Sequence, residues 1–351
     1  MTAPATAAAS ARTGTATRPT VPSTPSAPSA TSTPAPPALA GTLPATAVDA
    51  VLRASLLEDA PYGDITSQIL IPADARATAV LAARVPGILS GGEVFAAAMK
   101  LTDADAAVVL LVADGTAFAA GTPLARVTGN ARAVLLAERV ALNLVQRMSA
   151  IATKTAEFVA LVDGTGARIT DTRKTTPGLR VLERYAVRCG GGTNHRFSLS
   201  DAVLAKDNHL AVLTGGDASK LTAVLLEAKA RLGHTVHFEV EVDAMEQIEP
   251  VLAAGVDTIM LDNFTLAELA AGVALIGGRA RVEASGNVNL ATVAGIAATG
   301  VDVISIGGLT HSVAALDLGL DIELALEAGT EPGTEPVTES GTEPSAGRRA
   351  P

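Results

Sequence analysis

Positively charged side chains gather in one stretch of a chain that is acidic as a whole. Residues 168–209 hold eight Arg and Lys against four Asp and Glu, whereas the 351-residue protein has a formal net charge of −10 at pH 7. Arginine presents a planar fork that suits a carboxylate, and lysine a point charge that suits phosphate. This asymmetry indicates a pocket for a small polyanion, although a solvated Arg-Lys pair has the same composition. The candidate cations are Arg173, Lys174, His195, Arg196 and Lys206.

Two carboxylates alternate with apolar residues in the run FEVEV. Phe238, Val240 and Val242 face one way in a strand, so that Glu239 and Glu241 face the other. Carboxylates on an inner face are costly unless they bind a cation, sugar hydroxyls or basic partners. Asp262 closes the next strand-like run and completes a Mg²⁺ or ribose site with Glu241. An internal Glu–Lys network is the competing interpretation.

Small residues follow other strand-like runs and predict an anion cradle. EASGN (283–287) and SIGG (305–308) each end a run with small side chains and free amides, as in the phosphate sites of barrel enzymes. The three glycines at 190–192 also permit backbone amides to approach an anion.

Three residue types allow more than one role. Lys206 ends an apolar run, so it is a rim lysine, a substrate cation or a Schiff-base nucleophile. His195 and His209 are acid–base groups or structural histidines. Cys189 has no paired base in view, which argues against a nucleophilic thiol.

These residues need a frame of parallel strands. Strand-like runs begin near 168, 202, 236, 257, 280 and 302, and the last four are each followed by a helix-like segment. This alternation predicts parallel βα units. Nearly every run ends in charged or small polar residues, as in barrel enzymes, and no GxGxxG motif opens the region as in a dinucleotide-binding fold. A barrel is therefore favoured.

The residues before the barrel predict a mixed α+β layer. AVDAVLRASLL (47–57) suits a short helix, and residues 76–128 alternate β-branched runs with turns and one helix near Glu93–Leu101. Residues 134–162 have helical periodicity, with Arg139, Asn143 and Arg147 on one polar stripe.

Composition excludes several classes of protein. The acidic charge argues against a general nucleic-acid binder, and a single cysteine excludes a disulfide framework or a cysteine-based zinc site. No apolar run is long enough for a membrane span, and no secretory signal is present. The Ala/Pro/Thr/Ser leader predicts disorder rather than a transit peptide, and the GTEP-repeat tail also predicts disorder. We expect a cytoplasmic protein.

Nine stretches of the chain resemble the quinolinate phosphoribosyltransferase family, in the family's order over roughly residues 48–325. The stretches are EDAPYGDITS, AERVALN, TRKTTPGLR, GGGTNHR, KDNH, EVEVD, LDNF, EASGN and IGGLTHSVAALD. The resemblance implies the α/β class, with an N-terminal α/β sandwich and an incomplete α/β barrel. It also implies a homodimer with shared active sites, in which quinolinate reacts with phosphoribosyl pyrophosphate to give nicotinate mononucleotide, carbon dioxide and pyrophosphate.

The resemblance divides the chain and assigns roles to its residues. The expected segments are a leader (1–47), a sandwich domain (48–147, completed by 312–328), a barrel (148–311) and a tail (329–351). Quinolinate binding falls on Arg173, His195, Arg196 and Lys206, with Arg139 from the partner subunit. The resemblance assigns contact with phosphoribosyl pyrophosphate to Lys174. It assigns binding of ribose and Mg²⁺ to Glu241 and Asp262, and binding of the 5′-phosphate to Ser285, Gly286 and Gly307. Lys174, Lys206, Glu241 and Asp262 are the expected catalytic residues.

Three other functions remain open at this stage. One is a paralogous phosphoribosyltransferase with a different acceptor, and another is an aldolase or decarboxylase that forms a Schiff base on Lys206. The third is a non-catalytic phosphosugar-binding protein, which the cost of unused buried charges argues against.

Overall fold

The computed structural model describes residues 42–323. The expected leader and tail fall outside these residues, except for positions 42–47. Helix α1 begins at Ala45, three residues before the expected start of the folded core. The described residues form two α/β parts, one built on an antiparallel sheet and one on a parallel sheet, which confirms the predicted fold class.

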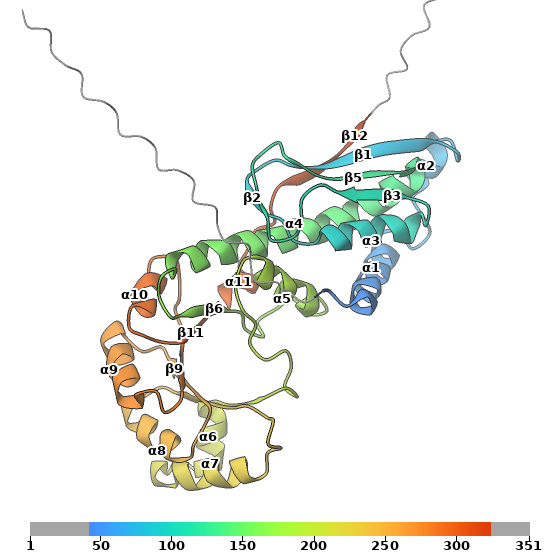
Figure 1. Ribbon diagram of the computed structural model, residues 1–351. Coiled ribbons are helices and arrows are strands. Elements are labelled where there is room, and N and C mark those ends of the chain that lie inside the picture. Colours follow the sequence, from blue (N-terminus) through green and yellow to red (C-terminus); the bar gives the residue numbers. More distant parts are fainter. Residues whose placement is uncertain (1–41, 324–351) are drawn as a thin grey trace, which may run out of the picture. The chain divides into compact units, whose positions relative to one another are not determined.

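An antiparallel sheet with the strand order β12-β1-β5-β3 forms the first part. Its strands are β1 (Arg76–Ala83), β3 (Ala107–Leu110), β5 (Pro123–Asn130) and β12 (Leu318–Glu323), with β2 (Gly87–Ile88) and β4 (Ala117–Phe118) as a separate pair. Its helices are α1 (Ala45–Asp59), α2 (Ile65–Leu70), α3 (Gly92–Thr102) and α4 (Ala131–Leu161). Helices α3 and α4 pack on each other beside the sheet (Figure 1). The last described strand, β12, pairs with β1, so the chain returns to this part after the second sheet.

Helix ends in this part follow from local capping chemistry. The carboxylate of Asp64 accepts hydrogen bonds from the amides of Thr66 and Ser67, which starts α2 within the EDAPYGDITS motif. The side chain of Asn130 accepts from the amide of Ala133 at 3.2 Å and starts α4 directly after β5. The 31-residue helix α4 then buries an apolar stripe along its length.

A six-stranded parallel sheet with the order β6-β11-β10-β9-β8-β7 forms the second part. The strands are β6 (Arg168–Thr170), β7 (Val203–Ala205), β8 (Phe238–Val242), β9 (Thr258–Asp262), β10 (Arg281–Ser285) and β11 (Val303–Ser305). The helices are α5 (Arg180–Cys189), α6 (Asp207–Thr214), α7 (Leu221–Ala230), α8 (Ile248–Ala253), α9 (Leu266–Ile276), α10 (Val293–Ala297) and α11 (Gly308–His311), with the short 3₁₀ turns η1 (Ala218–Lys220) and η2 (Met245–Gln247).

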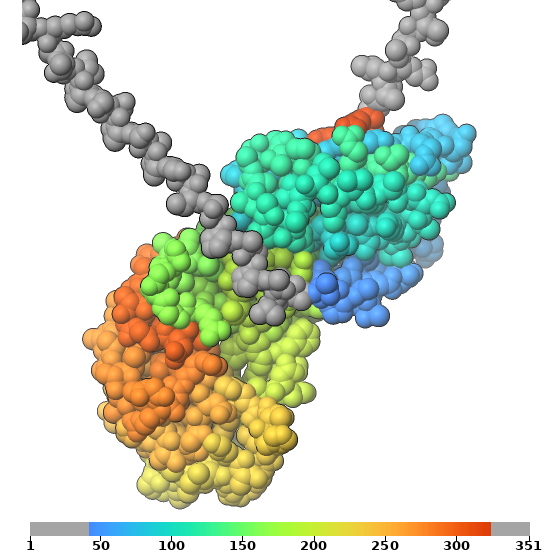
Figure 2. Space-filling model, in the orientation of Figure 1, coloured from blue at the N-terminus to red at the C-terminus, as the bar shows by residue number. Residues whose placement is uncertain are grey.

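The strand order makes this sheet an incomplete barrel. Each strand from β7 to β10 pairs with the next in sequence, and β11 pairs with β6, the first strand. Strands β6 and β7 do not pair, and a single parallel bridge between Thr170 and Thr193 extends the sheet beyond β6. Helices α8, α9 and α10 lie outside the strands, where Figure 2 shows them as a continuous surface in yellow to orange.

Helix α4 belongs to both parts. It contacts α3, β2 and β5 in the first part, and α5 and β6 in the second. The expected boundary at residues 147 and 148 therefore lies within one continuous helix. Within residues 42–323, we find no helix with the length and apolar character needed to cross a bilayer.

Candidate active site

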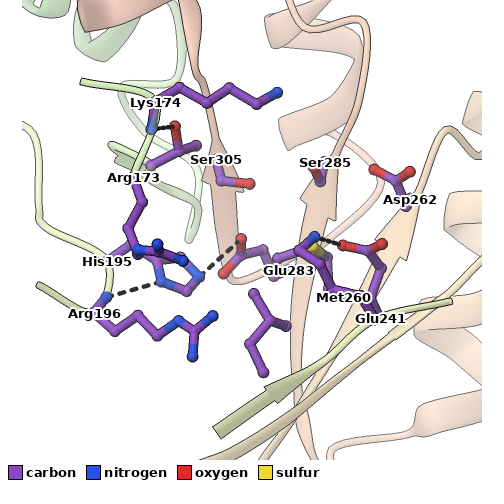
Figure 3. A pocket seen from close by; sticks show the side chains of 13 residues that line it. Arg173, Lys174, His195, Arg196, Glu241, Met260, Asp262, Glu283, Ser285 and Ser305 are labelled. Carbon is purple, nitrogen blue, oxygen red and sulfur yellow. Dashed lines mark hydrogen bonds and ion pairs between the residues drawn. The ribbon is translucent and has the colours of Figure 1, made fainter. Parts of the chain in front are cut away.

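A cavity of about 430 Å³ lies at the carboxyl ends of the parallel strands. Its lining residues come from strands β7 to β11, from the loop after β6 and from the segment between α5 and β7 (Figure 3). They are Thr172, Arg173, Lys174, His195, Arg196, Leu204, Lys206, Glu241, Met260, Asp262, Glu283, Ser285 and Ser305. The structure thus brings together Arg173, Lys174, His195, Arg196, Lys206, Glu241, Asp262 and Ser285, which the sequence had selected.

Arg173 and Lys174 reach this cavity from the loop after β6. No side chain among residues 42–323 forms an ion pair or hydrogen bond with their charged groups, and the Nε atom of Arg173 is buried without a partner. The backbone that carries them is fixed, because the amide of Lys174 donates to Thr172 Oγ1 and its carbonyl accepts from Thr310 Oγ1 at 2.7 Å. Two positioned cations therefore face the cavity with their hydrogen-bonding capacity unused.

His195 and Arg196 are held in place by a buried network that the sequence analysis missed. The carboxylate of Asp171 accepts from the backbone amide of His195 at 2.8 Å and from the side chain of Asn194 at 2.6 Å. Arg184 donates to Asp171 and to the carbonyls of His195 and Arg196. Because Asp171 lies two residues before Arg173, one carboxylate ties together both segments that carry the cations. The position of Asp171 at the end of a strand-like run, in ITDTRK, was the only signal for it.

Burial sets the electrostatics of this network. Burial raises the pKa of Asp171 to about 6, although Arg184 and the bonds from His195 and Asn194 oppose the rise. The pKa of Arg184 is lowered by burial, against the attraction of Asp171. The ion pair between Asp171 and Arg184 therefore forms although burial removes both groups from water, which costs free energy.

His195 contacts two buried carboxyl groups below the cavity. Its Nε2 atom lies 3.3 Å from Glu239 and 3.5 Å from Glu283. Burial lowers the pKa of His195, but the two carboxylates outweigh it and raise the pKa to about 10. The amide of Arg196 donates to Nδ1 at 2.8 Å, which opposes this rise, because an accepting Nδ1 favours the neutral ring with its proton on Nε2 (Figure 3). The three groups are close enough for a shared metal ion, but a proton on Nε2 occupies the lone pair that a metal would need.

Lys206 and Glu241 form an ion pair on the opposite wall of the cavity. This pair matches the internal Glu–Lys network that competed with the metal interpretation. Lysines that form Schiff bases are usually desolvated. The side chain of Lys206 is 44% exposed and its ammonium group pairs with the carboxylate of Glu241, which argues against a Schiff-base role. Asp262 lies at the end of the neighbouring strand β9, beside Ser285 in the ladder to β10, and accepts a hydrogen bond from Asn263.

Three selected residues do not line the cavity in this chain. Arg139 is exposed on α4, and its expected approach to the site depends on a second subunit. Gly286 has a φ of +91° and packs against Asn263, so a side chain there would strain the turn after β10. Gly307 packs against the side chain of Lys174. Both glycines shape the cavity edge by leaving room for their neighbours.

The prediction that Gly190, Gly191 and Gly192 crowd an anion is wrong. Their amides donate to the carbonyls of Ala186, Arg188 and Val187, where they end helix α5. A Cβ atom at Gly190 would lie 2.6 Å from Thr155 Cβ on α4. The glycines are needed because α5 ends directly against α4, and no amide remains for a ligand.

The remaining candidates have structural roles. Cys189 is buried, and burial raises the pKa of its thiol to about 11, which makes it a poor nucleophile. Nδ1 of His209 accepts from the backbone amide of Lys206 at 3.1 Å and thus fixes the turn into α6.

A second cavity of about 400 Å³ lies at the amino ends of the same strands. Arg168, Thr258, Arg281 and Val303, which start or nearly start their strands, contribute to its lining. His195, Arg196 and Glu283 line both cavities. The floor of the first cavity is therefore one layer of side chains thick at these residues.

Comparisons with known proteins agree with this architecture. Residues 64–149 match the family model "Quinolinate phosphoribosyl transferase, N-terminal domain", and residues 151–321 match the corresponding C-terminal domain model. The chain is 44% identical over 275 residues to a nicotinate-nucleotide pyrophosphorylase [carboxylating] of Mycobacterium leprae, covering 77% of this chain and 95% of the relative. It is 40% identical over 264 residues to a probable enzyme of the same name from Bacillus subtilis, covering 75% and 89% of the two chains.

Solved structures show the same fold. The structure of NadC from Streptococcus pyogenes has a TM-score of 0.76 and 38% identity, covering 81% of this chain and 99% of that chain. A nicotinate-nucleotide pyrophosphorylase from Francisella tularensis has a TM-score of 0.74 and 35% identity, covering 80% and 98%.

Proposed function

The chain belongs to the quinolinate phosphoribosyltransferase family, and from this premise we infer that it transfers the phosphoribosyl group of phosphoribosyl pyrophosphate to quinolinate. The reaction is decarboxylating, yields nicotinate mononucleotide, carbon dioxide and pyrophosphate, and is a step of de novo NAD synthesis. The observation that carries this conclusion is the cavity with Arg173 and Lys174, which are unpaired within residues 42–323, at one side and Glu241 and Asp262 at the other.

The cations are suited to a small aromatic diacid. Arg173 and Arg196 converge from two segments that Asp171 ties together, so they can meet two adjacent carboxylates of one ring, and His195 lines the cavity beside them. The charge of Arg196 lies close enough to Arg173 to lower its own pKa, after the larger effect of burial. A dianionic guest relieves that repulsion. Quinolinate bound in this way has a fixed orientation, which aims its ring nitrogen, next to C2, at the anomeric carbon.

The opposite wall is suited to the sugar. Departure of pyrophosphate builds positive charge on the anomeric carbon, which the carboxylates of Glu241 and Asp262 stabilise. We assign Lys174 to the developing pyrophosphate charge and Ser285 to the 5′-phosphate, and both residues line the cavity. Once the ring nitrogen carries ribose, its positive charge accepts the electron pair released by decarboxylation at the adjacent carbon. Positioning and charge therefore perform the reaction without a covalent enzyme intermediate.

Magnesium is part of this proposal. Glu241 and Asp262 offer the oxygen ligands that Mg²⁺ prefers, and both face the cavity from neighbouring strands. When bound, the ion neutralises charge on the pyrophosphate.

We also propose a cytoplasmic homodimer with shared active sites. Arg139, which is exposed on α4, supports the dimer. It has no partner within residues 42–323, and it does not line the cavity of its own subunit. Tyr62, Ile65 and Ile69 are each at least 70% exposed around α2, which supports an interface with a second copy.

An acceptor assay tests the function directly. The full chain is incubated with phosphoribosyl pyrophosphate, Mg²⁺ and either quinolinate or nicotinate, and pyrophosphate and carbon dioxide are measured. We expect both products with quinolinate and neither with nicotinate. Turnover of nicotinate in preference to quinolinate would instead support the paralogue with a different acceptor.

A further inference from the structure

The loop that carries Arg173 and Lys174 needs support from outside itself. Residues 171–179 connect β6 to α5 and form no helix or strand. Asp171 anchors the first residue of this loop, but the two cations extend from its middle. A displacement of about 1 Å in a group that positions a substrate can cost about 10²-fold in rate. The far side of the loop must therefore be held in place as well.

Glu183 and Arg147 hold that far side at Thr176. The carboxylate of Glu183, a residue that is 1% exposed, accepts a hydrogen bond from the amide of Thr176 at 3.1 Å. Its other oxygen pairs with Arg147, whose Nε atom donates to it at 2.7 Å. Nη2 of Arg147 also donates to Thr176 Oγ1 at 2.8 Å. Both the backbone and the side chain of Thr176 are thus fixed.

The same guanidinium reaches Lys174 through Thr310. Nη2 of Arg147 donates to the carbonyl of Thr310 at 2.8 Å. The hydroxyl of Thr310, which is fully buried, donates in turn to the carbonyl of Lys174 at 2.7 Å. Lys174 therefore lies between two points that Arg147 holds. We call Arg147, Thr176, Glu183 and Thr310 the loop clasp.

The loop clasp connects the loop to rigid elements. Arg147 comes from α4, on the polar stripe that the sequence predicted, and Glu183 comes from α5. Helices α5 and α11 both pack against α4 (Figure 1). Within residues 42–323, the lining of the substrate cavity includes no residue of the clasp. The clasp therefore acts on a substrate only through the loop that it holds.

The ion pair in the clasp contributes geometry more than stability. Removing a carboxylate from water costs free energy, and a buried ion pair is often no more stabilising than apolar packing. The pair of Glu183 with Arg147 adds what apolar packing does not, namely directed hydrogen bonds to one loop. A lysine at position 147 would keep the charge, but it does not present the planar fork that spans several acceptors.

We propose that Arg147 is a positioning residue, which sets the placement of Arg173 and Lys174 in the substrate cavity through the loop clasp. The inference rests on the proposed function, because that function assigns quinolinate and pyrophosphate charge to these two cations. Opening the clasp moves Arg173 away from the diacid, so the KM for quinolinate rises. A merely structural tie between α4 and α5 predicts a different result. Loss of folded protein lowers kcat and leaves KM unchanged, because every molecule that remains folded has a normal site.

Steady-state kinetics of Arg147→Lys in the full chain, with saturating phosphoribosyl pyrophosphate and Mg²⁺, separates these two roles. We expect the KM for quinolinate to rise about tenfold and kcat/KM to fall about 10²-fold. Thr176→Val removes one contact of the clasp and leaves the ion pair, so its KM should rise about threefold. Because Arg147→Lys already breaks that contact, the double variant should have the KM of Arg147→Lys within about twofold.

Arg279→Lys is the matched control. Arg279 also pairs with a glutamate, Glu249, and donates to the backbone carbonyls of Leu275 and Ile276. It lies outside the lining of the substrate cavity. Both kinetic constants of this variant should equal those of the wild type.

Several results would overturn the inference. They are a fall in kcat with a wild-type KM in Arg147→Lys, wild-type values of both constants in that variant, and multiplied effects in the double variant. If Arg147→Lys does not fold, Thr176→Val decides alone, and a wild-type KM there would also overturn the inference. A wild-type chain that does not turn over quinolinate would refute the proposed function, on which the inference rests.

Discussion

Individual residues at this site differ in how their charge is balanced. Arg184 is neutralised by Asp171, and Lys206 by Glu241, whereas Arg173 and Lys174 have no anionic partner within residues 42–323. Paired cations hold the backbone or the cavity wall, and unpaired cations are available to a guest. The sequence showed the excess of positive charge but not this division, because pairing depends on which loops meet in space.

The buried carboxyl of Asp171 predicts a pH-dependent stability. Its folded-state pKa of about 6 lies above the unfolded value of about 3.9, so its contribution is present at low pH and is lost as the pH rises through 6. The free energy of unfolding of the wild type relative to Asp171→Asn should therefore fall by about 1–2 kcal/mol between pH 5 and pH 7.5. Urea unfolding of both proteins at the two pH values measures it. A difference that grows with pH would contradict the assignment.

At the scale of elements, the strands were predictable and the glycine-rich turn was not. The predicted strand starts near 168, 202, 236, 257, 280 and 302 lie within two residues of β6 to β11. Parallel strands that are buried on both faces consist of apolar residues in a continuous run, so these runs locate the strands in the sequence. In contrast, Gly190 to Gly192 looked like an anion cradle because sequence does not show that α5 ends against α4. The Asp171 network was missed for the same reason.

The close approach of α5 and α4 predicts an intolerance of side chains at Gly190. In Gly190→Ala the new Cβ atom would meet Thr155 on α4, and overpacking of this kind costs about 1–3 kcal/mol. Urea unfolding should show this loss, while Gly166→Ala, whose Cβ atom would meet nothing within 4 Å, should change stability by less than about 0.5 kcal/mol. Equal stability of the two variants would show that the helices separate without cost.

At the scale of the molecule, one long helix and one returning strand join the two sheets. Helix α4 packs on both, and β12 crosses back to pair with β1. The order of strands and helices predicted the barrel, but the return of β12 came from the family resemblance rather than from any local pattern. The assignment of Arg139 to the active site of a partner subunit also came from the family resemblance and not from a local pattern.

Shared active sites predict complementation between two inactive variants. Arg139→Ala and Arg173→Ala damage different halves of each shared site, so each protein alone should be nearly inactive. After the two are mixed and allowed to exchange subunits, roughly a quarter of wild-type activity should return, since half of the dimers are mixed and each contains one intact site. Arg279→Ala, an exposed surface variant, serves as the mixing control. If activity does not return although exchange is demonstrated, each site belongs to a single subunit.

The central claim is that unpaired cations at the carboxyl ends of the strands hold the diacid, and calorimetry of Arg173→Ala tests it most directly. Loss of a charge-assisted contact should weaken quinolinate binding at least about tenfold, while phosphoribosyl pyrophosphate binds as in the wild type. Arg279→Ala should bind both ligands normally. Unchanged quinolinate affinity in Arg173→Ala would contradict the account.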